Sequence, residues 1–260
     1  MRADEPGYRL RLAVGPADLI GAQRLRYRVF VTEMGGDGPL VDHTAQLERD
    51  EFDAAFDHLL LIDPRIDPAT GDHVVGAYRL LPGDRVGAGQ FYSESEFDLG
   101  VLRTGGRRVL ELGRSCVHPD HRGGTAMFHL WNGLADYVLD RGIEVLFGVA
   151  SFHGTDAAPY AQALSWLHHH HMAPPGLRVT ARMAQRHAMD LVAPERLDRA
   201  AAMAATPALI KAYLRLGGFV GDGAWIDHAF NTTDVCLVMD TARMSERHRA
   251  FYLRKQGRGA

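Results

Sequence analysis

The segment from Val109 to Phe152 constrains the fold of this chain more than any other part of it. An apolar run at Val109–His118 predicts a strand, and a glycine-rich turn follows it. Thr125–Arg141 has helical periodicity and is ended by Gly142, and Val145–Phe152 is a second apolar strand. Two strands joined through a helix run parallel in one sheet. The sequence therefore predicts an α/β fold.

The flanking segments add further strands and helices to this unit. We expect a mixed central sheet with helices on both faces, in a single domain over residues 1–260 with a core at about 8–183 and a C-terminal extension at about 184–260. A polar insertion spans about 83–108, and Asp18 is expected to cap the first helix. The other predicted strands are Tyr8–Val14, His58–Asp63, Val74–Leu81, Leu177–Met183 and Val235–Asp240, and the other helices are Leu19–Met34, Pro159–His171, Glu195–Ala205, Ala208–Leu216 and Arg243–Tyr252.

Composition excludes several classes of protein. The 260 residues are 46% hydrophobic and 23% charged, which is typical of a globular protein, and the net charge of −3 makes nucleic acid an unexpected partner. No apolar run approaches the roughly 20 residues of a membrane span, and the polar N-terminus predicts a cytoplasmic protein. Cys116 and Cys236 lack metal-ligand spacing, so we expect two buried thiols.

The glycine-rich turn has the layout of an anion site. Residues His121 to Ala126 follow a strand and open a helix, where backbone N–H groups and the positive helix end converge. The turn has neither the Gly-x-x-x-x-Gly-Lys nor the Gly-x-Gly-x-x-Gly pattern, which argues against nucleotide-hydrolysing and nicotinamide enzymes. A Gly-Gly pair before a helix is also compatible with a turn that binds nothing.

This turn resembles the pyrophosphate loop of the GNAT N-acyltransferases, Gln/Arg-x-x-Gly-x-Gly/Ala, although a histidine stands at its first position. The resemblance implies an acyl-CoA or acyl-carrier N-acyltransferase fold. It also implies that the pantetheine arm of the donor is held by His121, Arg122, Gly123, Gly124 and Ala126.

Four other segments resemble, in order, the signature residues of the acyl-homoserine-lactone synthases. They are Arg26-Tyr27-Arg28-Val29-Phe30, Asp50-x-x-Asp53, Val75-Gly76-Ala77-Tyr78-Arg79-Leu80 and Glu111-x-x-Arg114. This resemblance implies acyl carrier protein as the partner that brings the donor. The tryptophan that those synthases carry after the first helix is replaced by Gly35 and Gly36, which argues against a lactone product.

The rest of the chain resembles the ornithine N-acyltransferases of bacterial ornithine-lipid synthesis. The similar segments are 151–156, 168–174, 209–218 and 230–236. The resemblance implies transfer of a 3-hydroxyacyl group from acyl carrier protein to the α-amino group of L-ornithine, with phosphopantetheine supplied by the donor and no bound cofactor. Because the product is lipid-like, we also expect peripheral contact with the inner face of the cytoplasmic membrane. The alternatives are a lactone synthase that uses S-adenosylmethionine and a non-catalytic acyl-ligand binding protein.

Glu111 is the candidate catalytic base. It lies within an apolar strand beside the turn, where a carboxylate is costly unless it is paired or used. Attack of an amine on a thioester requires an acceptor for the ammonium proton, and the resemblance to the lactone synthases supports Glu111 in this role. The other interpretation is an ion pair between Glu111 and Arg114.

The remaining charged residues of the signature segments are candidate substrate contacts. Asp50 and Asp53 would hold the cationic acceptor, and arginines would bind its carboxylate or position the acidic groups. A structural ion-pair network explains the same residues equally well. The candidate arginines are Arg26, Arg79 and Arg114.

Two further features have simpler explanations than catalysis or metal binding. Cys116 is expected to be a packed thiol, with a covalent acyl-cysteine as the alternative. The run His168–His171 points in four directions on a helix and therefore cannot hold one ion, so no metal site is expected.

Overall fold

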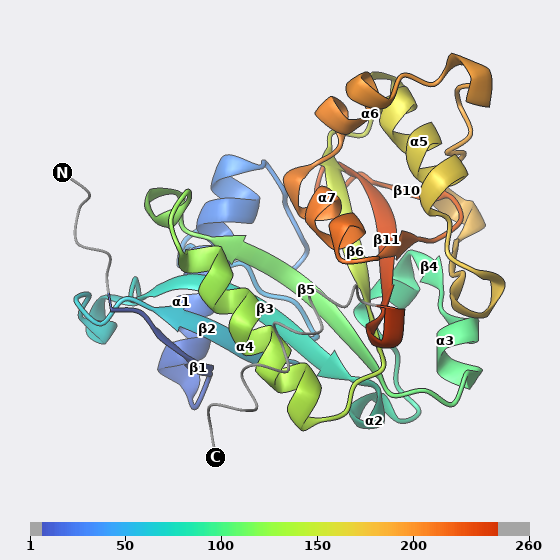
Figure 1. Cartoon of the computed structure of the whole chain (residues 1–260). Coiled ribbons are helices and arrows are strands. Elements are labelled where there is room, and N and C mark those ends of the chain that lie inside the picture. The colour runs from blue at the N-terminus through green and yellow to red at the C-terminus, as the bar shows by residue number, and fades with distance from the viewer. Residues whose placement is uncertain (1–6, 244–260) are drawn as a thin grey trace. The chain divides into compact units, whose positions relative to one another are not determined.

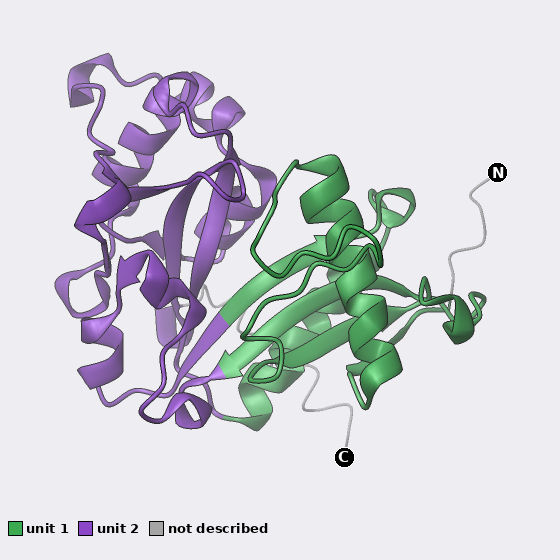
Figure 2. Cartoon of the chain, turned by 180° about the vertical axis from the view of Figure 1, so that it is seen from behind, with its two compact units in different colours: residues 1–81, 112–141 green, residues 82–111, 142–260 purple. Residues whose placement is uncertain are grey.

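The computed structural model describes residues 7–243, whose contacts divide into two compact units (Figure 2). Unit 1 contains residues 7–81 and 112–141, and unit 2 contains residues 82–111 and 142–243. Strand β5, Val109–Val117, belongs to both units, because the division falls between its residues 111 and 112.

Unit 1 is an antiparallel sheet with a helix on each face (Figure 1). Its strands are β1 (Arg9–Leu12), β2 (Asp57–Ile62), β3 (Val74–Pro82, of which Pro82 falls in unit 2) and the second part of β5. Helix α4 (Ala126–Asp140) contacts β1 and β2, where Gly133 leaves room for Leu10 and Leu59. On the other face, α1 (Pro16–Arg26) packs Ala22 and Leu25 in a cluster that includes Leu60. Alternation along β2 thus supplies both faces with apolar side chains.

Unit 2 is built on β6 (Val145–His153), which pairs in parallel with the first residues of β5. Its other edge pairs along all nine residues with β11 (Thr232–Asp240), and β11 pairs with β10 (Ala224–Asp227) and β9 (Phe219–Val220). The remaining strands are β4 (Phe97–Asp98), β7 (Thr180–Ala181) and β8 (Arg186–His187), and the helices are α2 (Gly83–Val86), α3 (Gly100–Thr104), α5 (Ala161–His171), α6 (Arg199–Ala205) and α7 (Ala208–Arg215).

The central prediction of a parallel strand–helix–strand unit is confirmed. Val109 pairs with Val145 and Glu111 with Phe147, and α4 lies between the two strands in sequence. The strands predicted at His58–Asp63 and Val74–Leu81 are also confirmed, as β2 and β3, and they pair antiparallel. The mixed sheet and the helices on its faces establish the predicted α/β class.

The first helix differs from its prediction at both ends. It begins at Pro16 rather than Leu19, because proline is compatible with a first helical position, and Asp18 lies inside the helix. The Asp18 carboxylate reaches back to the Val14 amide at 2.9 Å and so still satisfies a group before the helix. From Tyr27 to Glu33 the backbone is a π-helix, which ends before Gly35 at a φ of 76°.

The strand predicted at Leu177–Met183 is wrong for most of its length. Leu177, Val179 and Ala181 are buried at alternate positions, which is the pattern that suggested a strand. Their backbone groups do not form a long ladder: the Asp222 amide donates to the Val179 carbonyl at 2.8 Å, and only Thr180–Ala181 forms a short strand, paired with β4.

The insertion at 83–108 is a packed part of unit 2 rather than only a polar loop. Phe91, Phe97, Leu99 and Leu102 are buried, and a 3₁₀ helix spans Tyr92–Ser95. The expected extension is likewise integrated, since β11 comes from it. The predicted helix Arg243–Tyr252 lies outside the described residues except for Arg243. No helix within residues 7–243 has both the length and the apolar character that a bilayer crossing requires.

Candidate active site

Six charged side chains of unit 1 form a cluster that we call the arginine–carboxylate cluster. The helix α1 contributes Arg26 at its last residue, while Arg79 lies on β3 and Arg114 on β5. The connection between α1 and β2 contributes the carboxylates Glu48, Asp50 and Asp53. Three guanidinium groups therefore meet three carboxylates.

The Arg26 guanidinium is the most enclosed member, with no exposed surface. Its Nη1 donates to Asp53 Oδ1 at 2.5 Å, its Nη2 donates to the Glu48 carbonyl at 2.7 Å, and its Nε donates to the Glu48 carboxylate. Gln23, one turn earlier on α1, donates to the other oxygen of Asp53 at 2.9 Å. The last turn of α1 is thus tied to the loop that follows it.

Arg79 and Arg114 complete the cluster from the sheet. Nη1 of Arg79 lies 2.6 Å from Asp50 Oδ2 and 3.0 Å from Asp53 Oδ1, and its guanidinium lies over the Phe56 ring at 4.5 Å. Arg114 Nε donates to Glu48 Oε1 at 3.1 Å, and its Nη2 lies 3.4 Å from Asp50 Oδ2.

These contacts fix the charge of the buried acids. Burial alone would raise the pKa of Glu48, but the charges of Arg114, Arg26 and Arg79 lower it to about 2. Burial opposes the same shift at Asp53, where Arg26 and Arg79 lower the pKa to about 2. Both side chains are therefore carboxylates at neutral pH.

The structural ion-pair network left open by the sequence is what these residues form. Arg26 and Arg79 are almost fully buried, whereas the side chains of Arg114 and Asp50 keep 10% and 17% of their surface exposed. Sequence reasoning did not single out Glu48, although it lies at the start of an acidic stretch, two residues before Asp50. A substrate contact within the cluster is consistent with Asp50 and Arg114, and remains a prediction.

Arg114 also has an unusual backbone. Its φ of 48° lies in the left-handed region, where a residue other than glycine is uncommon. Arg114 adopts this conformation within strand β5. Such conformations persist where the surroundings impose them, and here the side chain is held by Glu48 and Asp50.

Glu111 lies in unit 2, at the last pair of the β5–β6 ladder, opposite Phe147. Its Oε2 accepts from the Tyr92 amide at 2.9 Å, and its Oε1 accepts from the Ser93 amide at 2.7 Å and from the Ser93 hydroxyl at 2.5 Å. Only 1% of Glu111 is exposed. The sequence located this carboxylate but did not reveal the donors, because Ser93 is 18 residues away in an insertion that read as polar.

The turn that precedes α4 is held by side-chain contacts within unit 1. His121 Nδ1 lies 2.9 Å from the Tyr8 hydroxyl, and Arg122 makes two 2.7 Å contacts with Glu33, one to each carboxylate oxygen. Gly123 has a φ of 78°, which favours glycine, and Ala126 is the first residue of the helix. The first amide groups of α4 have no partner carbonyl within the helix, and anion binding by them stays a prediction.

Both cysteines are free and buried. Burial raises the pKa of the Cys116 thiol to about 12, and burial also raises the pKa of Cys236. A thiol of this kind is a poor nucleophile at neutral pH, which agrees with the packed role expected for Cys116.

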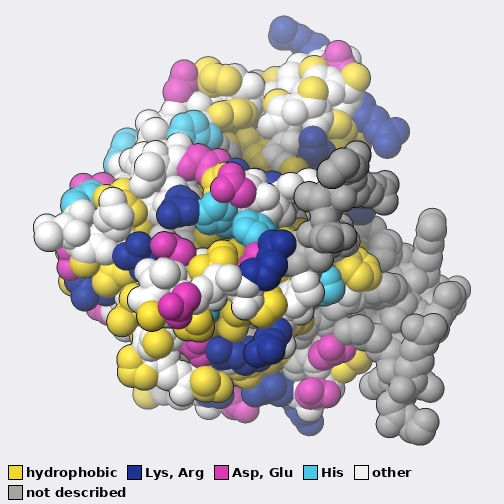
Figure 3. Space-filling model, turned by 90° about the vertical axis from the view of Figure 1, so that its left-hand side faces the viewer, with side chains coloured by type: hydrophobic (Ala, Val, Ile, Leu, Met, Phe, Trp, Pro, Cys, Tyr) yellow, Lys and Arg dark blue, Asp and Glu magenta, His cyan; other side chains and the backbone are white. Residues whose placement is uncertain are grey.

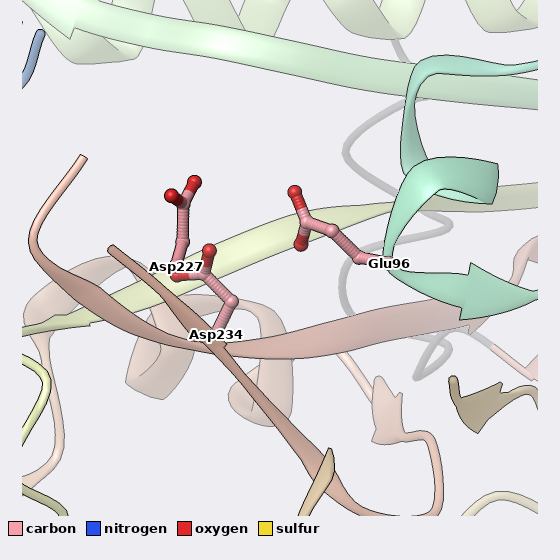
Figure 4. A group of neighbouring side chains, drawn as sticks. All are labelled: Glu96, Asp227 and Asp234. Carbon is pink, nitrogen blue, oxygen red and sulfur yellow. The ribbon is translucent and has the colours of Figure 1, made fainter. Parts of the chain in front are cut away.

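A second group of carboxylates lies in unit 2. The oxygens of Glu96, Asp227 and Asp234 lie within 4.8 Å of one another, with Glu96 following a 3₁₀ helix and the aspartates on β10 and β11 (Figure 4). Asp227 Oδ1 accepts from the Ala229 amide at 2.8 Å, and Asp234 Oδ2 accepts from the Thr232 hydroxyl at 3.1 Å. Within residues 7–243 this is the one group with ligand atoms close enough for a metal, and His168–His171 do not form another.

The surface carries both signs of charge. On the face shown in Figure 3, Lys and Arg side chains are mixed with Asp and Glu and with hydrophobic side chains. Exposed ion pairs such as that of Arg49 with Asp42, at 2.8 Å, follow the same pattern.

Comparison with known proteins places this arrangement in a family. Residues 25–132, which include the cluster, Glu111 and the turn, match the acetyltransferase (GNAT) domain. The chain is 62% identical to an L-ornithine N(alpha)-acyltransferase of Rhodobacter capsulatus over the whole length of both chains. The chain belongs to the L-ornithine N(alpha)-acyltransferase family. Another member, from Rhizobium meliloti, is 43% identical over 95% of this chain and 85% of its own.

Solved structures share the fold of this L-ornithine N(alpha)-acyltransferase family member. FeeM, an N-acyl amino acid synthase from uncultured soil microbes, matches with a TM-score of 0.51 and 12% identity over 92% of this chain and 93% of its own. BjaI, a CoA-dependent acyl-homoserine lactone synthase, matches with a TM-score of 0.51 and 17% identity over 91% of this chain and 85% of its own. The predicted GNAT-like N-acyltransferase fold is confirmed.

Proposed function

We propose that this enzyme transfers a 3-hydroxyacyl group from acyl carrier protein to the α-amino group of L-ornithine, which is the first step of ornithine-lipid synthesis. The observation that supports the acceptor is the 62% identity, over both full lengths, to a protein named for N(alpha)-acylation of L-ornithine. The products are N-acyl-ornithine, a lyso-ornithine lipid, and the free thiol of the carrier.

The reaction needs one proton acceptor. The amine nitrogen of ornithine attacks the thioester carbonyl, the new C–N bond forms, and the C–S bond breaks with the sulfur leaving as a thiol. The nitrogen loses a proton in this exchange, Glu111 accepts it, directly or through water, and the same proton is then passed to the departing sulfur, so that the carrier leaves as a thiol and Glu111 returns to its carboxylate form. Its burial in unit 2 and its place at the end of a strand ladder support this role, since a buried carboxylate has a high free-energy cost that function can justify.

The donor enters through its phosphopantetheine arm. The residues assigned to this arm are His121, Arg122, Gly123, Gly124 and Ala126, of which Gly123 has the backbone that such a turn needs. The amides at the start of α4 bind the phosphate, and no resident cofactor takes part. Acyl carrier protein as the donor protein is part of the proposal.

The acceptor is positioned by the exposed side of the arginine–carboxylate cluster. Asp50 and Arg114 retain exposed surface, so they contact ornithine, while Arg26, Arg79 and Asp53 hold these two in place. The amphipathic product leaves toward the inner face of the cytoplasmic membrane, with the enzyme in the cytoplasm.

The test is mass spectrometry of the products formed by the purified protein from 3-hydroxyacyl carrier protein in separate reactions with ornithine, lysine, glutamine or S-adenosylmethionine. The expected product is N-acyl-ornithine alone, and the same reaction with 3-hydroxyacyl-CoA is expected to be much slower. A lactone from S-adenosylmethionine would replace the proposal with lactone synthesis. Absence of any product from a folded, carrier-binding protein would favour a binding protein.

A second measurement tests the base. Glu111→Gln is expected to lower kcat by about 100-fold or more, because the amide cannot accept the proton. Wild-type turnover in this variant would remove Glu111 from the reaction while leaving the acceptor and the product unchanged.

A further inference from the structure

The Ser93 hydroxyl is a buried polar group that the proposed reaction has not yet used. Ser93 has 1% of its surface exposed, and its Oγ lies 2.5 Å from Glu111 Oε1, the same oxygen that accepts from the Ser93 amide at 2.7 Å. A serine hydroxyl has a single proton to donate, and a carboxylate can only accept. This serine therefore donates its proton toward Glu111.

The 3₁₀ helix that carries Ser93 does not depend on the Ser93 hydroxyl for its position in the fold. The 3₁₀ helix Tyr92–Ser95 is held by Glu94, whose Oε2 accepts from the Phe91 amide at 2.7 Å and from Arg103 at 2.8 Å. Phe91 packs edge-on against the Phe147 ring of β6, with centroids 5.0 Å apart. Two amides also reach Glu111 from this helix, and they remain when the hydroxyl is removed.

We infer that Ser93 is a positioning residue for the reaction, and that its hydroxyl orients the Glu111 carboxylate and sets the pH below which that carboxylate no longer accepts the amine proton. The inference rests on the proposed role of Glu111 as the base. A hydrogen bond donated to a carboxylate favours its charged form over its protonated form. Loss of the donor should therefore make Glu111 protonate at higher pH and should loosen its orientation.

Cys236 and Glu96 are ionisable groups of unit 2 that share the electrostatic environment of this carboxylate. The Cys236 thiol on β11 interacts electrostatically with both Glu111 and Glu96, and burial keeps it protonated at neutral pH. Glu96 follows the same 3₁₀ helix, and its own negative charge would favour the protonated form of Glu111. The hydrogen bond donated by the Ser93 hydroxyl acts in the opposite direction, because it favours the charged form of Glu111.

The experiment measures kcat, and KM for ornithine, from pH 5 to 9 in Ser93→Ala, Ser93→Thr and the control Ser95→Ala. Ser95 lies in the same 3₁₀ helix, but its hydroxyl donates to the Tyr92 carbonyl at 2.8 Å and not to Glu111. A hydrogen bond to a charged group corresponds to about a tenfold change in proton affinity or more, so the acidic limb of the kcat profile should move up by about one pH unit in Ser93→Ala. KM for ornithine should change less than twofold, Ser93→Thr should restore the profile, and Ser95→Ala should match the wild type.

Failure of this inference can be told from failure of the proposed function. If Glu111→Gln is inactive and folded Ser93→Ala keeps the wild-type acidic limb, the inference is wrong and the base stands. If Glu111→Gln keeps wild-type turnover, the base is wrong as well. The double variant Ser93→Ala/Glu111→Gln tests whether Ser93 acts through Glu111. Adding Ser93→Ala to Glu111→Gln should not lower kcat further, and an additive loss of kcat would show that Ser93 acts without Glu111.

Discussion

The Arg26 guanidinium, which has no exposed surface, donates a hydrogen bond to Asp53 Oδ1 at 2.5 Å. Burial opposes the charge of Arg26, but Glu48 and Asp53 outweigh it and raise the pKa of the guanidinium. The pair therefore links the end of α1 to the following loop as two full charges. Removal of one member leaves the other buried and uncompensated.

Substitution of Arg26 should be strongly destabilising. Arg26→Met keeps much of the side-chain volume but leaves Glu48 and Asp53 without their buried partner, and we expect the free energy of unfolding to fall by about 3–5 kcal/mol. Urea denaturation followed by circular dichroism measures it. The control is Arg49→Ala, which removes a half-exposed ion pair with Asp42 and should cost less than about 1 kcal/mol. Equal losses of unfolding free energy in the two variants would contradict the expectation that the buried ion pairs of Arg26 matter more for stability than the half-exposed pair of Arg49.

The buried acids predict how stability depends on acid pH. The pKa values of Glu48 and Asp53 are about 2 in the folded protein, below the ordinary values of about 4 in an unfolded chain. Their contribution is complete above the ordinary values and is lost as the pH falls toward 2. Unfolding free energies between pH 5 and 2.5 should therefore decline less steeply in Glu48→Gln than in the wild type. Asp84→Asn, at an exposed position, should keep the wild-type slope.

The two thiols should be inert in the native protein. Because burial raises the pKa of both cysteines, iodoacetamide at pH 8 should modify neither in the folded chain and both in 6 M guanidinium, as read by intact mass. Cys116→Ala should keep most of kcat/KM. Rapid labelling of Cys116 together with loss of activity would instead support an acyl-cysteine intermediate.

The contact between Arg122 and Glu33 predicts opposite effects on the donor. Glu33→Gln releases the Arg122 guanidinium from its partner and should lower KM for acyl carrier protein about threefold, whereas Arg122→Ala should raise it by about threefold to tenfold. Both effects should shrink as salt is raised. Unchanged KM values in both variants would remove Arg122 from the donor site.

Asp50 is the member of the cluster to test for acceptor binding. Asp50→Asn should raise KM for ornithine by about tenfold with a smaller change in kcat, since a carboxylate contact with an ammonium group is lost. Asp227→Asn, in the separate carboxylate group of unit 2, is the comparison. If Asp227→Asn raises KM for ornithine and Asp50→Asn does not, the acceptor binds at the carboxylate group of unit 2 and not at Asp50.

Sequence patterns predicted the parts of the fold in which periodicity and burial coincide. The strands β2, β3, β5 and β6 and the helix α4 each bury one apolar face or run, so their positions were readable. The strand prediction at 177–183 failed because alternate burial there comes with backbone bonds to residue 222, which no local pattern reveals. The short strands β8 and β9 were missed for a related reason, since each depends on a partner more distant in sequence, whereas β10 was missed although its partner β11 follows directly in a hairpin.

The site was predictable as a set of residues but not as a set of contacts. Family resemblance located Arg26, Asp53 and Arg79. Only the structure shows that both arginines form ion pairs with Asp53. The partners of Glu111 were out of reach, because a serine in a polar insertion carries no signal that it will be buried beside a carboxylate. Glu48 was visible only as one acid among several.

The pairing of β6 with β11 has a consequence for synthesis of the protein. Val145 pairs with Asp240, so this edge of β6 stays open until almost the whole chain has been made. At roughly 5–20 residues per second, the 78 residues between the two strands take several seconds to emerge. Unit 1 has all its residues by position 141 and can form in that interval. The exposed edge of β6 is a template for pairing with other chains, which makes this the interval in which the nascent enzyme is most prone to aggregate.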